Sequence, residues 1–298
     1  MTRHLLDITD FTAGELRTIL SLAERPELPH ALAGKGAALI FQKPSNRTRQ
    51  SMEMAVVQLG GHPVYTRGEE VGFDVREPLE DIVRVMAGYH AVLAARVFSH
   101  DIVTRMAAVS AVPVVNMLSD HSHPLQALAD VLTMQQVHGS LVGLSVAFVG
   151  DYNNVSRSLA EACATLGATL VLACPVGYHA DDAELERVNA LGPGAVKQVH
   201  RPAEAVVGAV AVHTDSWTSM GREAEKQERS QAFEGFTVDT ALMAQAAPGA
   251  AFYHCLPAHR GFEVSAEVID GPASRVFSQA HNRMHAARGA LAFLLGVR

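Results

Sequence analysis

Eight short apolar runs, separated by segments with helical spacing of apolar residues, constrain the fold of this chain most. The runs lie near residues 37–41, 62–65, 91–97, 112–118, 144–149, 168–174, 209–214 and 250–255. Apolar runs of this length are typical of strands that are buried on both faces of a sheet. Because strands that alternate with helices form parallel sheets, we predict an α/β fold of doubly wound parallel sheets.

Start signals mark several of the intervening helices. Thr12 and Glu15 form a capping box at the first helix, Pro78 stands in the first turn of a helix over 78–88, and Pro124 opens another. The segment 176–195, rich in Gly, Ala and Asp, is predicted to form a surface helix and a loop.

A length of 298 residues suggests about two domains. The segment 137–143 contains two glycines near the midpoint of the chain, so we place the boundary there and expect domains over 1–137 and 138–278. The remaining segment, 279–298, contains a long apolar helix near 282–296 that is expected to pack back on the first domain.

Composition restricts the classes of function. The chain is 48% hydrophobic and 18% charged, as soluble globular proteins are, and it has no apolar stretch near the roughly 18 residues that a membrane span needs. A net charge of −7 without a basic run argues against a nucleic-acid partner. Three widely spaced cysteines, Cys163, Cys174 and Cys255, suit a reducing compartment, and Asp7 and Asp10 interrupt any secretory signal. We therefore expect a cytoplasmic protein without a membrane or nucleic-acid partner.

Polar residues follow six of the predicted strands, where ligands bind in open parallel sheets. They are Ser45 to Arg49, Arg96, His123 with Gln126, Asp151 with Asn153 and Asn154, Asp215 with Ser219, and His254 with Cys255. This repetition predicts one active site in a cleft between two α/β domains.

The turn Ser45-Asn46-Arg47-Thr48-Arg49 lies where a strand passes into a helix. Ser and Asn are good N-caps, the first-turn amides can bind an anion, and the arginines and hydroxyls are donors that match a phosphate. By itself such a turn is more typical of a capped helix with solvated arginines. The other polar clusters favour the phosphate site.

His123 and Gln126 are spaced i and i+3, so they lie on one helix face. The histidine could donate to a carbonyl oxygen and the glutamine could bind an adjacent amide. A histidine cap with a solvated glutamine is the alternative. Arg96 ends a buried strand, where a charge needs either a ligand or a structural ion pair.

The second half suggests an amino-acid substrate. Residues 146–154 begin like a dinucleotide-binding turn but lack the G-x-G-x-x-G pattern, which contradicts a nicotinamide dehydrogenase. Asp215 and Ser219 could bind an amino group, although D-x-x-x-S-x-G is also a common loop. Cys255 beside His254 could be a nucleophile, a metal ligand together with His259, an inert thiol, or a substrate contact, which we favour.

Taken in order, these motifs resemble those of the aspartate/ornithine carbamoyltransferase family over the whole chain. The turn at 45–49 resembles the family's S-T-R-T-R, and the segment 123–126 resembles its H-P-x-Q. Residues 150–154, 215–221 and 254–257 resemble the ornithine branch, since the aspartate branch has H-P-L-P where this chain has H-C-L-P.

The resemblance implies a role for each motif residue. Carbamoyl phosphate would be held by Ser45, Asn46, Arg47, Thr48, Arg96, His123 and Gln126. The amino-acid end of ornithine would be held by Asn154, Asp215, Ser219 and Met220, with Cys255 and Leu256 beside the reacting amine. Arg283 would lie beside the carbamoyl oxygen and the phosphate, so the residues implied in catalysis are Arg47, Arg96, His123, Cys255 and Arg283.

The activity implied is carbamoyl transfer from carbamoyl phosphate to the δ-amine of L-ornithine, which gives L-citrulline and phosphate in arginine biosynthesis. The first domain would bind carbamoyl phosphate and the second ornithine, with no metal or redox cofactor, in a homotrimer or a multiple of trimers. Two alternatives stay open. One is a different amine acceptor, such as putrescine or an N-acylated ornithine, and the other is a catalytically silent ligand-binding relative.

Three positions depart from the family pattern. Asn46 replaces a Thr, Glu70 stands where the family has a Gln that reaches the neighbouring subunit's site, and His281 stands where an acid precedes Asn-Arg. A carboxylate facing a dianion is unfavourable, so the loop around Glu70 is expected to adopt a different geometry.

Overall fold

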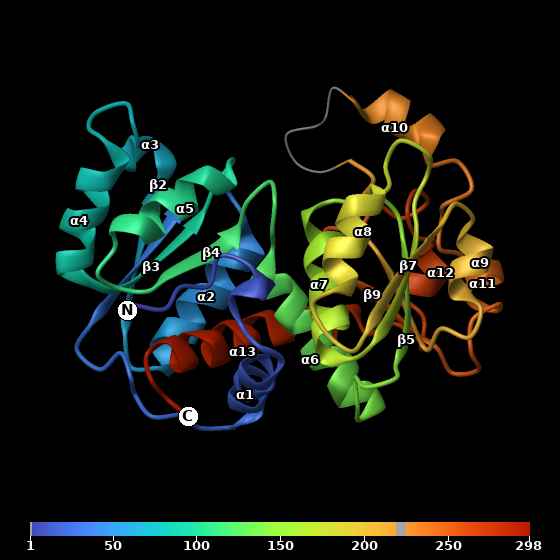
Figure 1. Ribbon diagram of the computed structural model, residues 1–298, viewed down its shortest axis with the longest axis horizontal. Helices are drawn as coiled ribbons and strands as arrows, with labels where there is room; N and C mark the ends of the chain where they lie inside the picture. The colour runs from blue at the N-terminus through green and yellow to red at the C-terminus, as the bar shows by residue number, and fades with distance from the viewer. Residues whose placement is uncertain (1, 219–224) are drawn as a thin grey trace. The chain divides into compact units, whose positions relative to one another are not determined.

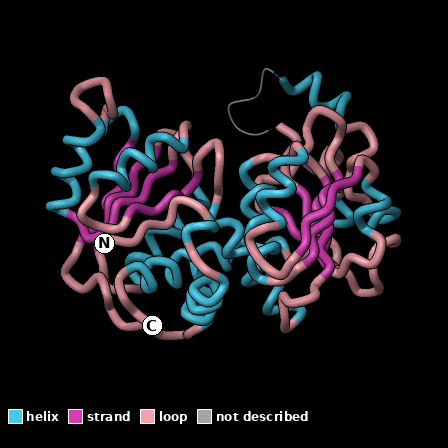
Figure 2. The backbone as a smooth tube through the Cα atoms, viewed as in Figure 1, coloured by secondary structure: helices cyan, strands magenta, loops and turns pink. Residues whose placement is uncertain are grey.

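The computed structural model describes residues 2–218 and 225–298 of the chain (Figure 1). The chain forms two compact units, one from residues 1–129 with 281–298 and the other from residues 130–280. Each unit contains one parallel sheet with helices on both faces, as Figure 2 shows in magenta and cyan. The predicted α/β fold with two parallel sheets is therefore confirmed.

The first unit holds a four-stranded sheet of order β2-β1-β3-β4. Its strands are β1 (Gly36–Phe41), β2 (His62–Arg67), β3 (His90–Arg96) and β4 (Val114–Leu118). Its helices are η1 (Ile8–Asp10), α1 (Ala13–Glu24), α2 (Asn46–Gln58), α3 (Gly68–Val71), α4 (Leu79–Tyr89) and α5 (His100–Val109), together with parts of α6 (Pro124–His138) and α13 (Val276–Leu294). The strand order reverses between β1 and β3, and at such a switch point the loops after the two strands separate and leave room for a ligand.

Burial explains why these strands form. Ala38 and Ile40 on β1 and Leu93 and Ala95 on β3 are fully buried in one core together with residues of α4 and α5. The register of β1 and β3 pairs Phe41 with Arg96, so the two strands end at the same level of the sheet. The loop after β1 therefore begins beside the guanidinium of Arg96.

The second unit holds a five-stranded sheet of order β7-β6-β5-β8-β9. Its strands are β5 (Ser145–Val149), β6 (Thr169–Ala173), β7 (Ala195–Val199), β8 (Ala211–Thr214) and β9 (Ala251–His254). Its helices are α7 (Asn154–Leu166), α8 (Asp182–Asn189), α9 (Pro202–Val206), α10 (Lys226–Ala232), α11 (Thr240–Met243) and α12 (Ala266–Ile269). Here the order reverses between β5 and β8, which brings the loops after those two strands together.

The C-terminal helix α13 packs on α1 and α2 of the first unit, as predicted (Figure 1). Gly289 allows a close approach, since a Cβ there would lie 2.6 Å from the carbonyl oxygen of Ile19 on α1. Phe293 meets the ring of Phe11 edge to face at 5.6 Å. Both contacts bury apolar surface that the helix could not bury by itself.

All eight predicted strands occur, but the sequence reasoning missed β7. This strand occupies the edge of its sheet, and Lys197 on it is exposed, so its composition does not show the apolar run of a central strand. The last helix begins at Val276 rather than near residue 282, because Val276 is buried in the core of the second unit. No helix in the described part of the chain could cross a membrane.

One buried histidine gives the second unit a pH-dependent stability. Burial, followed by the nearby His254, lowers the pKa of His213 from 6.5 to about 3. Its ring stacks on Tyr253 with centroids 4.9 Å apart. Below pH 6.5 the imidazole of His213 binds a proton in the unfolded chain but not in the folded chain, which favours unfolding. The free energy of unfolding is therefore unaffected by the protonation of His213 above pH 6.5 and decreases as the pH falls towards 3.

We expect His213→Phe to flatten the pH dependence of unfolding. The aromatic ring preserves the stacking, while the proton-linked loss of about 1–2 kcal/mol between pH 6.5 and pH 5 disappears. Urea unfolding at pH 7.5 and pH 5 measures the difference, with the exposed His62→Gln as the control. An unchanged difference between the two pH values in His213→Phe would contradict the assignment.

Candidate active site

The turn after β1 is a capped helix start. Ser45 is the N-cap of α2, where its Oγ accepts the backbone N–H of Thr48 at 3.4 Å and donates to Thr48 Oγ1 at 3.1 Å. Asn46 and Arg47 occupy the first turn and are exposed. The positive end of the helix dipole and the first-turn amides therefore face the same space as Arg47.

The two arginines of this turn are in different environments. Arg49 forms an ion pair with Glu53 at 2.8 Å, and its guanidinium lies 3.9 Å from the centroid of the Tyr65 ring. No such ion pair holds Arg47 among the residues that the structure describes. Arg49 is thus engaged along the helix, whereas Arg47 remains available for an anion at the helix start.

Arg96 and His123 extend this cluster into the interior. Arg96 Nη1 donates to Thr48 Oγ1 at 3.4 Å, and Arg96 is only 4% exposed. His123 is 6% exposed and Arg283 on α13 is 5% exposed. Burial, then Arg283 and Arg96, hold the pKa of His123 well below 6.5. At neutral pH its imidazole is therefore uncharged, and it can donate one N–H bond beside two cations.

Gln126 lies one turn after His123 and is 3% exposed. Its backbone N–H donates to the carbonyl of His123 at 3.0 Å, which starts helix α6. The structure thus brings Thr48, Arg96, His123 and Arg283 into one buried cluster of the first unit, with the half-buried Ser45 beside it and Gln126 on the adjoining turn.

The departure at Glu70 has a local explanation. Glu70 is exposed on the short helix α3 and pairs with Arg67 at 3.1 Å. Its other oxygen accepts the backbone N–H of Arg67, and these contacts lower the pKa of Glu70. The carboxylate therefore turns back on its own helix. His281 is an exposed residue of α13.

In the second unit, Asp215 is the centre of a polar cluster at the β5/β8 switch point. Its Oδ2 accepts a hydrogen bond from Asn153 Nδ2 at 3.1 Å, and its Oδ1 accepts the thiol of Cys255 at 3.0 Å and the backbone N–H of Ser216 at 2.7 Å. Three donors from three different loops fix the carboxylate. A carboxylate held in this way can bind a cationic amine.

Asn153 is a residue whose role the sequence reasoning missed. Its Oδ1 caps α7 by accepting the N–H groups of Val155 and Ser156, while its Nδ2 holds Asp215. Asn154, the first residue of α7, follows directly. Asn153 thus orients the carboxylate of Asp215, whereas Asn154 is the first residue of the helix. The absence of the G-x-G-x-x-G pattern from this turn gave no signal for that difference.

Asp151 lies in the same turn but does not cap α7, whose N-cap is Asn153. Asp151 forms an ion pair with Arg229 at 2.7 Å. Arg229 is 1% exposed and also donates to the backbone carbonyl of Trp217 at 2.9 Å. This buried pair anchors the turn after β5 to α10, and nothing in the local sequence indicates it.

The loop after β9 is held by His254. The ring Nδ1 accepts the backbone N–H of Leu256 at 2.8 Å, and Nε2 lies 3.2 Å from Glu263 Oε1. Leu256 adopts a positive φ of 59° and precedes a cis peptide bond to Pro257. These contacts place the Cys255 thiol against Asp215, while both ring nitrogens of His254 are engaged by Leu256 and Glu263, which argues against a Cys–His dyad.

Metal-type ligand atoms of Asp215, His254 and Cys255 lie within 4.8 Å of one another. Both ring nitrogens of His254 are already engaged, which disfavours a metal at this position. His259, the ligand considered from sequence, instead contacts Ser216 and Glu263. Ser219 and Met220 lie outside the described residues.

Comparison with known proteins identifies the family. The carbamoyl-P binding domain of aspartate/ornithine carbamoyltransferase matches residues 3–136, and the Asp/Orn binding domain matches residues 142–294. The ornithine carbamoyltransferase of Thermus thermophilus is 46% identical over 299 residues, covering 99% of this chain and 97% of the relative. The anabolic ornithine carbamoyltransferase of Pyrococcus furiosus is 44% identical over 304 residues, covering 99% of this chain and 96% of the relative.

Solved structures agree with this match. An ornithine carbamoyltransferase structure from Pyrococcus furiosus has a TM-score of 0.94 at 43% identity, covering 99% of this chain and 97% of that one. A mutant of an N-acetyl-L-ornithine transcarbamylase has a TM-score of 0.87 at 30% identity, covering 98% and 99%. The chain therefore belongs to the aspartate/ornithine carbamoyltransferase family.

Proposed function

We propose that this chain is an ornithine carbamoyltransferase, which transfers the carbamoyl group of carbamoyl phosphate to the δ-amine of L-ornithine. The observation that carries the proposal is 46% identity over 99% of the chain to a protein of that name. The products are L-citrulline and phosphate. The description of the Pyrococcus furiosus relative as anabolic favours the biosynthetic direction, towards arginine.

The first unit supplies the site for carbamoyl phosphate. Its phosphate binds the first turn of α2, where Ser45, Asn46 and Thr48 offer amides and hydroxyls and Arg47 and Arg96 neutralise the charge. Neutralisation makes phosphate a better leaving group. The carbonyl oxygen accepts from the uncharged imidazole of His123 and from Arg283, and Gln126 binds the carbamoyl amide.

The second unit supplies the site for the amino acid. Asp215 binds the α-amino group, Asn154 with Ser219 and Met220 completes the amino-acid end, and Cys255 and Leu256 lie beside the side-chain amine. The uncharged δ-nitrogen attacks the carbonyl carbon, a C–N bond forms, and the C–O bond to phosphate breaks. The proton that the nitrogen loses ends on the departing phosphate, which leaves as hydrogen phosphate. Positioning and electrostatic stabilisation suffice for this reaction, so the proposal includes no cofactor.

An acceptor assay tests the proposal. Carbamoyl phosphate is offered with ornithine, putrescine, N-acetylornithine or aspartate, and ureido product is measured. We expect citrulline from ornithine and little product from the other amines. Acetylation removes the charge that pairs with Asp215, putrescine lacks the α-carboxylate of an amino acid, and aspartate has no side-chain amine.

Two outcomes of the same assay would contradict the proposal. Faster carbamoylation of N-acetylornithine or putrescine would assign a different acceptor, as in the transcarbamylase relative of 30% identity. No ureido product with any amine would favour the silent ligand-binding relative that the departures at Glu70 and His281 suggest.

We also propose a homotrimer or a multiple of trimers. Apolar side chains are exposed on α2 and on the edge strand β2, namely Met54 (44%), Val57 (48%) and Val64 (36%). Adjacent exposed apolar residues beside an unpaired strand edge favour an interface between protein chains.

Light scattering should therefore give a mass near a multiple of three times 31.8 kDa. Val57→Asp should dissociate the assembly, because it places a charge in the interface, whereas Val176→Asp, at an exposed position of the second unit, should not. A wild-type mass equal to one chain would contradict the trimer.

We place the protein in the cytoplasm. Cys163, Cys174 and Cys255 form no disulfide, and burial raises the pKa of both Cys163 and Cys174 to about 12. Such thiols are unreactive and fit a reducing compartment.

A further inference from the structure

The N-terminal segment of the chain runs beside β4 and ends next to the loop that carries His123. Leu5 pairs with Val115 as a parallel bridge, with Leu5 N–H donating to Val114 at 2.9 Å and Asn116 N–H donating to Leu5 at 2.8 Å. The segment thus extends the sheet of the first unit along β4. Its next residues, Leu6 and Asp7, reach the carboxyl end of β4.

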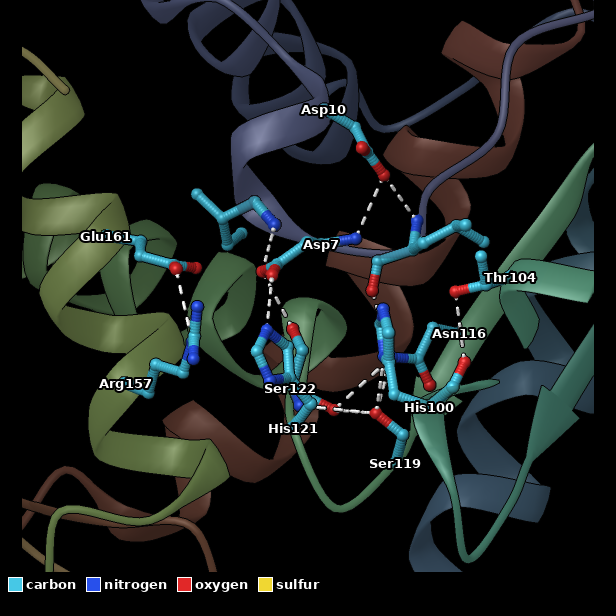
Figure 3. A network of polar contacts seen from close by, with 12 residues as sticks. Asp7, Asp10, His100, Thr104, Asn116, Ser119, His121, Ser122, Arg157 and Glu161 are labelled. Carbon is cyan, nitrogen blue, oxygen red and sulfur yellow. Dashed lines mark hydrogen bonds and ion pairs between the residues drawn. The ribbon is translucent and has the colours of Figure 1, made fainter. Parts of the chain in front are cut away.

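Asp7 makes a direct contact with that loop. Its Oδ1 accepts the hydroxyl of Ser122 at 2.8 Å, and the two side chains point towards each other in Figure 3. Asp7 is 8% exposed and Ser122 is fully buried. An O–H bond to a carboxylate in such surroundings is stronger than a bond between neutral groups.

The loop between β4 and α6 is held on every side of Ser122. The carbonyl of Ser122 accepts the backbone N–H of Ser119 at 2.9 Å and Asn116 Nδ2 at 3.3 Å, and its N–H donates to Ser119 Oγ at 3.2 Å. The same Asn116 amide donates to the carbonyl of Leu6 at 2.9 Å (Figure 3). The peptide group that joins Ser122 to His123 is therefore fixed.

A second set of contacts holds the outer side of the loop. The other oxygen of Asp7 lies 3.6 Å from His121 Nε2, and the His121 ring lies 4.9 Å from the ring of His100. His100 Nδ1 in turn lies 2.8 Å from Ser119 Oγ. On the far side of His123, the N–H of Ala127 bonds to the carbonyl of His123 at 3.2 Å and begins α6. The side chain of Asp7 thus joins the loop to the N-terminal segment through Ser122 and His121, and it acts together with the backbone contacts to hold His123.

We propose that Asp7 is a positioning residue, which acts through Ser122 to hold the imidazole of His123 at the carbonyl oxygen of carbamoyl phosphate. The inference rests on the proposed function, in that His123 donates to that oxygen. The donor of an oxyanion bond must be placed to within about 0.5 Å, so a loosened loop should slow the reaction without unfolding the protein.

Ser122→Ala is the cleanest test, because Asp7 also caps η1 through the N–H of Ile8 and its removal would disturb that helix. We expect Ser122→Ala to lower kcat/KM for carbamoyl phosphate by about 10- to 100-fold, with the KM for ornithine unchanged. Asp7→Asn keeps an oxygen that can accept from both Ser122 and Ile8, so its loss of kcat/KM should be smaller. The double variant should be no worse than Ser122→Ala, since both substitutions act on one contact.

The matched control is Ser110→Ala. Ser110 is also buried in the first unit, and it makes two hydrogen bonds to Val112 at the opposite end of β4. Ser110→Ala should lower the temperature of thermal unfolding by about as much as Ser122→Ala does, but it should leave the kinetic constants unchanged. Calorimetry with inorganic phosphate should give the same Kd for wild type and Ser122→Ala, because the phosphate site lies on α2.

Wild-type kinetic constants in Ser122→Ala would overturn the proposal, as would additive losses in the double variant. A loss of kcat/KM of equal size in Ser110→Ala would also overturn it, because that would show that any loss of stability in the first unit lowers the activity. The outcome of this test does not depend on which amine is the acceptor. If the wild type carbamoylates a different amine, the proposed function fails while the constants for carbamoyl phosphate, measured with that amine, still test Asp7.

Discussion

Arg47→Gln should lower kcat/KM for carbamoyl phosphate by about 100- to 1,000-fold, the largest effect that we expect from a single substitution in the first unit. Arg47 stands in the first turn of α2 and is exposed, so its charge is available to a phosphate and contributes little to the fold. Gln keeps the helix propensity and a hydrogen-bond donor. The loss should therefore report the charge that neutralises the leaving group. Steady-state citrulline formation measures it.

Arg49→Gln is the matched control, because the same chemical change is made two residues away on the same helix. Arg49 is held by Glu53 and by the Tyr65 ring, and an exposed ion pair of this kind stabilises a protein by about 1 kcal/mol or less. We expect wild-type KM for carbamoyl phosphate and a slightly lower unfolding temperature. Equal losses in both variants would mean that the phosphate site has been misplaced.

Asp215→Asn should raise the KM for ornithine by about 10- to 100-fold, since a hydrogen bond to a charged group contributes about 1.5–3 kcal/mol. The amide carries no charge for the α-amino group. It also cannot accept at both oxygens, although Asn153, Cys255 and Ser216 all donate to this side chain. The KM for carbamoyl phosphate should stay constant, because that substrate binds the other unit.

Asp239→Asn provides the control for Asp215→Asn. Asp239 is a partly buried N-cap in the same unit, and its Oδ1 accepts the N–H of Leu242 at 2.8 Å. An amide oxygen can replace that acceptor, so stability and both KM values should change little. A KM for ornithine that does not respond to Asp215→Asn would remove Asp215 from the acceptor site.

The strands and motifs could be predicted because their signals are local. A central parallel strand such as β1 is an apolar run, and the turn from Ser45 to Arg49 contains its own cap and its own donors. Edge strand β7 and the early start of α13 were missed, because each depends on what covers it. Lys197 faces solvent at a sheet edge, and Val276 is buried only because other segments form the core around it.

Positioning residues could not be predicted for the same reason. Asp7 and Ser122 are 115 residues apart, and Asn153 and Asp215 are 62 residues apart. No periodicity or motif connects such pairs. The direction of the Glu70 carboxylate could not be predicted either. It pairs with Arg67, and only the folded loop shows that it does so.

The sequence by itself determined the parallel α/β architecture, the capped turn at the start of α2 and the resemblance to the family, because each depends on neighbours within a few residues. Tertiary structure decided how the functional groups meet. The order of strands places β1 beside β3 and β5 beside β8, which brings Arg96 to Thr48 and Asn153 to Asp215. Burial between Arg96 and Arg283 then keeps His123 uncharged, and the cost of removing a charge from water depends on what surrounds it in the fold.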